Sequence, residues 1–141
     1  MGDAVSSLLF ACCLLLASSA ALACGHCVED QVAAVYDHAL IRQALDRKHK
    51  VVFFAIEGAL EANSAQRRDI ERAAAKVAGV DARSVRLSIE SAALSAAFDP
   101  ARVSAEQIRQ SVQERLILKG LSLKLLRVME QPAMAKSAAQ P

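Results

Sequence analysis

A short motif near the N-terminus carries the most reactive side chains of the sequence. Cys24 and Cys27 are three residues apart, with Gly25 and His26 between them. Two thiolates at this spacing can converge on one soft metal ion, and the imidazole can add a nitrogen ligand. We expect the helix that follows Cys27 to favour the thiolate forms. The motif therefore predicts a metal site made by Cys24, Cys27 and His26.

Other functions for the same pair stay open at the level of sequence. Cys-Gly-His-Cys is also the tetrapeptide of disulfide isomerases, so a thiol–disulfide redox protein is one alternative. Those enzymes place the motif after a strand of a thioredoxin sheet, whereas here it follows an apolar leader. A structural or incidental dithiol is a second alternative, and a lipidated Cys24 beside a spectator Cys27 is a third.

The segment before the motif has the pattern of an export signal. An apolar stretch over 8–17 is followed by small residues that end in Ala21-Leu22-Ala23. This pattern predicts a signal peptide over 1–23, cleaved before Cys24, and hence a periplasmic or secreted protein. The absence of Lys and Arg from its start, which carries Asp3, departs from the usual signal. The membrane becomes a partner only if the leader stays uncleaved or Cys24 is lipidated.

Composition and charge exclude several classes of function. The 141 residues include 17 Lys or Arg and 15 Asp or Glu, which gives a net charge of +2. The basic residues are scattered without an aromatic-interleaved run, so no nucleic-acid surface is predicted. Neither a nucleophile–His–Asp set nor a phosphate-binding loop is evident, so we expect no enzyme activity. Removal of the leader would also remove Cys12 and Cys13 and leave one dithiol in an oxidising compartment.

Hydrophobic periodicity and capping residues predict the elements that must position the motif. The patterns predict helices over 28–50, 64–80 and 104–118, and strands over 51–56, 84–91, 93–99 and 121–129. Asn63 with Gln66, and Ser104 with Gln107, are placed as capping boxes. The expected core includes Val51, Phe53, Ile70, Val77, Leu87, Phe98, Ile108 and Leu123.

The order of these elements indicates a fold of the α+β class. After the first helix the order is βαββαβ, which is typical of a ferredoxin-like four-stranded antiparallel sheet with both helices on one face. The continuous apolar run over 51–56 suits a central strand buried on both faces. The predicted organisation is a signal peptide over 1–23, a CxxC helix extension over 24–49, the ferredoxin-like domain over 50–129 and a disordered tail over 130–141.

Three stretches resemble a known family in their order and spacing. They are "VVFFAIEG" over 51–58, "VAGV" over 77–80 and "FDPARVSAEQI" over 98–108. Together they are similar to the heavy-metal-associated domain of copper chaperones and metal-pumping ATPases, over about Lys50 to Met129. The resemblance implies a Cu(I) ion, or another soft metal ion, as the ligand. It also implies a metal-transport protein as a partner, and a metal-free interaction module of the same family is a further alternative.

The metal loop of that family is not matched in this sequence. The family carries Met-x-Cys-x-x-Cys directly after the glycine that here is Gly58, whereas Glu61 and Ser64 stand at the two cysteine positions. A carboxylate and a hydroxyl are hard, weak ligands for Cu(I). We therefore expect the metal site to have moved to Cys24 and Cys27. In an unbroken helix His38 would lie about 16 Å beyond Cys27 and could not join that site.

Overall fold

The computed structural model describes residues 27–132. In chain order the elements are α2 (Val28–Ala34), α3 (His38–Asp46), β1 (Lys50–Gly58), α4 (Ser64–Ala75), the 3₁₀ turn η1 (Ala82–Ser84), β2 (Arg86–Ser88), β3 (Ala93–Phe98), α5 (Ala105–Leu116), the 3₁₀ turn η2 (Ile117–Lys119) and β4 (Leu121–Met129). Within these residues no helix is both long and apolar enough to cross a membrane.

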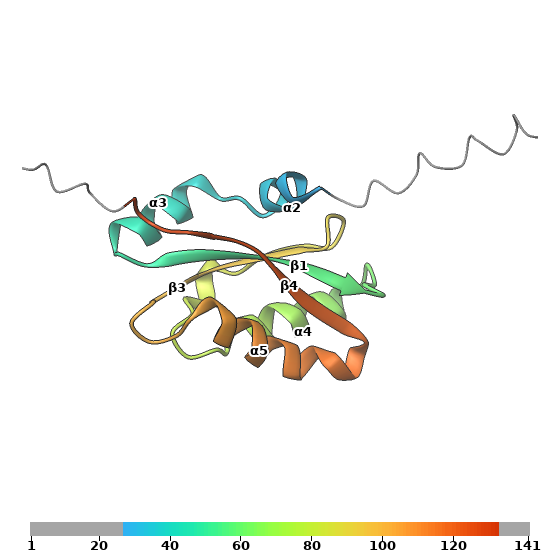
Figure 1. The fold of residues 1–141 in the computed structure, drawn as a ribbon. Helices are drawn as coiled ribbons and strands as arrows, with labels where there is room; N and C mark the ends of the chain where they lie inside the picture. The colour runs from blue at the N-terminus through green and yellow to red at the C-terminus, as the bar shows by residue number, and fades with distance from the viewer. Residues whose placement is uncertain (1–26, 133–141) are drawn as a thin grey trace, which may run out of the picture.

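The strands form one antiparallel sheet in the order β2-β3-β1-β4. This is the predicted ferredoxin-like arrangement, with β1 central and β2 at an edge. Helices α4 and α5 lie side by side on one face of the sheet, while α2 and α3 lie on the other (Figure 1). The predicted α+β class and sheet topology are confirmed.

Both faces of the sheet are buried, so β1 is covered on both sides. The inner face, defined here as the face against α4 and α5, includes Val52, Phe54 and Ile56 of β1. The outer face, against α2 and α3, includes Val51 and Phe53. The alternation follows from the pleat of a strand, in which successive side chains point to opposite faces. All eight residues of the predicted core are buried.

The predicted helix over 28–50 is wrong, because the structure has two shorter helices there and places Lys50 in β1. Helix α2 ends at Ala34, and α3 begins at His38 after the N-cap residue Asp37. The Asp37 carboxylate accepts a hydrogen bond from the Leu40 N–H at 3.1 Å. Aspartate at this position satisfies a backbone donor that a continuous helix would bond to a carbonyl, so it favours a new helix start.

Other predicted boundaries also differ from the structure. Helix α4 ends at Ala75 rather than near Gly79, and β2 has only three residues because the chain turns between Ser88 and Ala93. Ser104 and Gln107 form the predicted capping box of α5. At α4 only half of the predicted box forms, because the Gln66 side chain accepts from the Glu61 N–H instead.

The glycine that ends β1 permits a close approach of two backbones. Gly58 has φ +115°, and a Cβ placed on it would lie 2.3 Å from the carbonyl oxygen of Gly120. Any other residue would therefore push β1 away from the start of β4 and strain the backbone. Gly58 fixes where the sheet ends and the loop before α4 begins.

Candidate metal centre

Of the three predicted metal ligands, only Cys27 lies among the described residues. Cys24 and His26 fall outside them, so the geometry of the CGHC motif as a whole stays a prediction. Cys27 is the N-cap residue of α2, is exposed, and has a free thiol. Its backbone carbonyl accepts from the Gln31 N–H at 3.1 Å and so begins the helix. The thiol itself makes no capping hydrogen bond and is available to a ligand.

Helix α2 is attached to the sheet by three specific polar contacts. The Gln31 amide, buried under the helix, donates to the carbonyl of Ser91 at 3.2 Å. The Ser95 hydroxyl on β3 donates to the Val35 carbonyl at 2.9 Å, and Glu29 forms an ion pair with Arg127 on β4. These contacts fix the helix, and with it Cys27, against the outer face.

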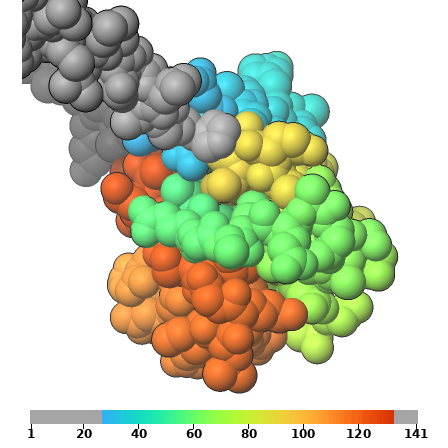
Figure 2. Space-filling model, turned by 90° about the vertical axis from the view of Figure 1, so that its right-hand side faces the viewer, coloured from blue at the N-terminus to red at the C-terminus, as the bar shows by residue number. Residues whose placement is uncertain are grey.

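The position of α2 places Cys27 toward the end of the sheet at which β1 ends. Gln31 reaches the turn between β2 and β3, where the Ala92 carbonyl accepts from the Ile56 N–H near the end of β1. Figure 2, which views the molecule from the right-hand side of Figure 1, shows α2 in blue above the β2–β3 region in yellow. The loop after β1 lies at this same end of the sheet.

The loop between β1 and α4 is closed by its own hydrogen bonds. The Asn63 amide donates to the Glu61 carboxylate at 2.6 Å, and its oxygen accepts from the Gln66 N–H at 2.7 Å. The Gln66 side chain in turn accepts from the Glu61 N–H. Glu61 is thus a member of the cap of α4, and Ser64 is the exposed first residue of that helix.

Neither described histidine completes a metal site in the structure. The sequence argument against His38 as a ligand assumed one unbroken helix from Cys27 to His38, and the break at Asp37 removes that assumption. Even so, residues 27–132 contain no group of three or more His, Cys, Asp or Glu side chains that could hold a metal ion. His38 is exposed at the start of α3, and His49 is half-buried just before β1. A metal at Cys27 would therefore take its other ligands from the residues before it or from a partner.

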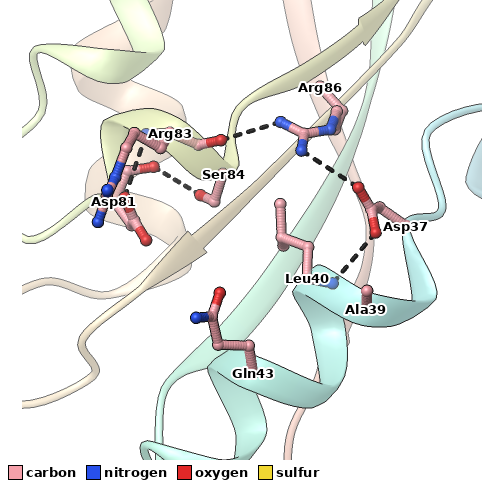
Figure 3. A pocket seen from close by; sticks show the side chains of 8 residues that line it. All are labelled: Asp37, Ala39, Leu40, Gln43, Asp81, Arg83, Ser84 and Arg86. Carbon is pink, nitrogen blue, oxygen red and sulfur yellow. Dashed lines mark hydrogen bonds and ion pairs between the residues drawn. The ribbon is translucent and has the colours of Figure 1, made fainter.

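A groove of about 620 Å³ lies between α3 and the segment around η1 and β2. Sequence reasoning did not anticipate it, because it depends on the helix break at Asp37. Figure 3 shows Arg86 reaching across it to the Asp37 carboxylate, a contact of 3.1 Å. Arg86 also donates to the carbonyls of Arg83 and Val85.

The polar groups that line this groove bond mainly to one another. The Asp81 carboxylate accepts from the Arg83 N–H, and the Ser84 hydroxyl donates to the Asp81 carbonyl. The Leu40 N–H, together with Arg86, lowers the pKa of the Asp37 carboxyl from its usual value. Because Arg86 and Asp37 pair across it, the groove joins α3 to the sheet edge.

Comparison with known proteins adds a likeness in fold. No family model matches the chain, and no curated protein matches it. One similar solved structure is a copper binding domain from HMA7, a P-type ATPase, with 18% identity and a TM-score of 0.48 over 56% of this chain and 96% of that one. Another is oxidized MerP from Ralstonia metallidurans CH34, with 22% identity and a TM-score of 0.43 over 55% of this chain and 96% of that one. At these values neither likeness bears on function.

Proposed function

We propose that this protein is an exported metal-binding or metal-passing protein that holds one Cu(I) or similar soft ion at Cys24 and Cys27. His26 supplies a third ligand, and a metal-transport protein is the partner that receives or delivers the ion. The observation that carries the proposal is the exposed, free thiol of Cys27 at the start of a helix fixed to the sheet.

The chemistry of the remaining sites supports the same assignment. The loop before α4 offers a carboxylate and a hydroxyl, and its carboxylate already accepts from Asn63. Thiolates are the ligands that Cu(I) prefers, and the two cysteines are the only ones that a cleaved chain would keep. A structural zinc site normally needs four ligands, so one chain supplies too few for it.

The decisive experiment is an anaerobic Cu(I) competition titration of the exported chain with its native N-terminus. We expect one ion per chain, with binding lost when Cys24→Ser and Cys27→Ser are combined. The matched control combines Glu61→Ala with Ser64→Ala in the loop, and we expect it to bind as the wild type does. His26→Ala should weaken binding without abolishing it.

Other outcomes of this experiment would contradict the proposal. Loss of binding in the loop pair alone would place the metal at the loop after β1, and no binding by the wild type would remove the metal function. Catalytic turnover of a disulfide substrate would instead support the redox alternative, because a binding protein takes up metal stoichiometrically. Intact-mass analysis of the exported chain should show that residues 1–23 are absent, and retention of Met1 or an added acyl chain would contradict cleavage before Cys24.

A further inference from the structure

Helices α2 and α3, together called the strap (residues 28–46), cover a smaller apolar cluster than the helices of the inner face do. The outer cluster has eight buried residues, whereas the inner cluster has seventeen. Three of the eight are alanines, so their side chains bury little area. Since the free energy of burial scales with apolar area, less is lost by separating the strap than by unfolding the inner side.

The polar contacts of the strap to the sheet are few. Two of them, Asp37 with Arg86 and Glu29 with Arg127, are ion pairs with considerable exposure of both side chains. Such pairs contribute little to stability because water and salt screen them. The others are hydrogen bonds to backbone carbonyls, two from Gln31 and one from Ser95. The strap is thus held mainly by the hydrogen bonds of these two side chains and by the small cluster.

Left-handed backbone conformations mark two turns beside the strap. Within residues 27–132 the only residues other than glycine with positive φ are Lys48, at 62°, and Ala92, at 48°. Lys48 joins α3 to β1, and Ala92 lies in the turn that Gln31 contacts. This conformation is disfavoured for residues with a Cβ and persists where surrounding contacts impose it. At Lys48 it belongs to the C-terminal cap of α3, because the Lys48 N–H donates to the Leu45 carbonyl and the His49 N–H to the Ala44 carbonyl. Lys48 is therefore the point at which the strap ends and the chain turns into β1.

We propose that the strap opens as one unit about a hinge at Lys48 while the ferredoxin-like unit stays folded. Opening uncovers the apolar outer face, which includes Val51, Phe53, Ala93 and Ala97. It also carries Cys27 away from the sheet, because Cys27 immediately precedes α2. The opening follows from packing alone and holds whether or not the motif binds a metal.

The test is native-state amide hydrogen exchange, read by mass spectrometry on peptides of the exported chain. We expect the hydrogen-bonded amides of α3 to exchange faster than those of α5, once both are corrected for intrinsic rates. This difference is the signature of local opening below the global unfolding free energy. Equal protection of α3 and α5 would show a single cooperative unit and overturn the proposal.

Two glutamines provide a matched pair of variants. Gln31 ties the strap to the β2–β3 turn, whereas Gln113 ties α5 to β4 by bonding Leu121 and Leu123. We expect Gln31→Leu to speed exchange of the strap about tenfold and to leave α5 unchanged, since the carbonyls that lose its hydrogen bonds, of Ser91 and Ala92, lie in the β2–β3 turn and not on α5. Gln113→Leu should speed exchange of α5 and leave the strap unchanged.

The variants decide the proposal in either direction. If either substitution speeds the strap and α5 by the same factor, the two do not open separately and the proposal is wrong. Should Gln31→Leu fail to fold, Ser95→Ala removes the second fastening contact, to Val35, without adding bulk. It must give the same selective increase in exchange of the strap.

Discussion

The inner and outer faces of the sheet are both buried, but their covers differ in kind. Helices α4 and α5 close the inner face with large residues such as Ile70, Ile108 and Leu116, each almost fully buried. On the outer face the strap contributes Val32, Val35, Ile41 and Ala44. The inner cover comes from within the βαββαβ unit, whereas the outer cover precedes it in the chain.

This difference explains a feature of β1 that the ferredoxin-like unit alone does not. An antiparallel sheet with helices on one face usually shows alternating apolar and polar residues. In β1 six consecutive residues, Val51 to Ile56, are buried. The continuous apolar run is satisfied only when the strap covers the outer face. The strap therefore completes the apolar packing of this sheet, in addition to carrying the CGHC motif.

The largest expected effect comes from removing the outer cover. A chain lacking residues 1–49 should still unfold cooperatively, because the inner cluster contains no residue of the strap. It should lose up to about 6 kcal/mol, since Val51 and Phe53 regain contact with water. Urea denaturation measures this loss, and sedimentation should show self-association through the uncovered face. Non-cooperative unfolding would show that the two covers form one inseparable core.

Much of this comparison could be predicted from the sequence. Period-two alternation in residues 85–89 indicated a half-buried edge strand, and the run over 51–56 indicated a central strand buried on both faces. The sequence did not show which helices cover the second face of this strand. Val51 and Phe53 share one expected core with Ile70 in the sequence, whereas the structure divides them between two clusters. Only the fold of the chain determines which face each residue meets.

The candidate site shows where sequence reasoning reaches its limit. The helix break at Asp37 had a local signal, because Asp is a favoured N-cap residue. The apolar stripe of Val28, Val32, Val35 and Ala39 nevertheless runs across Asp37 before it is lost, and it favoured one helix. No local signal predicted the half-formed cap of α4, since the Gln66 side chain could accept from the N–H of either Glu61 or Asn63. Exposure of Cys27 is consistent with the predicted site, while Cys24 and His26 lie outside the described residues.

A smaller effect should distinguish two isoleucines of equal size on opposite faces. Ile70 on α4 and Ile41 on α3 are 0% and 3% exposed. Ile70→Ala should lower the free energy of unfolding by about 2–5 kcal/mol, because it removes buried methyl groups and leaves a cavity. Ile41→Ala should cost less, because Ile41 packs in the smaller outer cluster, where three of the eight buried residues are alanines. Urea denaturation of both variants checks this, and equal losses would erase the distinction between the faces.

The smallest expected effect is a dependence of the strap on pH. The pKa of Asp37 is lowered by the Leu40 N–H and by Arg86, from a usual value of 3.8. Arg83 and Asp81 line the same groove, and His38 adjoins Asp37 in the chain. A carboxyl with a lowered folded-state pKa stabilises the fold above its usual pKa, and this contribution is lost as the pH falls through the lowered value. Exchange of the strap should therefore accelerate, relative to intrinsic rates, below about pH 4.

Two asparagine variants isolate this contribution from other carboxyls. Asp37→Asn keeps an N-cap oxygen but carries no charge for Arg86, so the acid dependence of strap exchange should flatten. Asp69→Asn is the matched control, since Asp69 pairs with Lys119 on the inner side and its pKa is also lowered. We expect the control to retain the full acid dependence of the strap. If the Asp37→Asn variant kept the acid dependence of strap exchange as well, a group other than Asp37 would govern the opening. The ion pair of Asp37 with Arg86 would then not be a difference between the outer and inner covers.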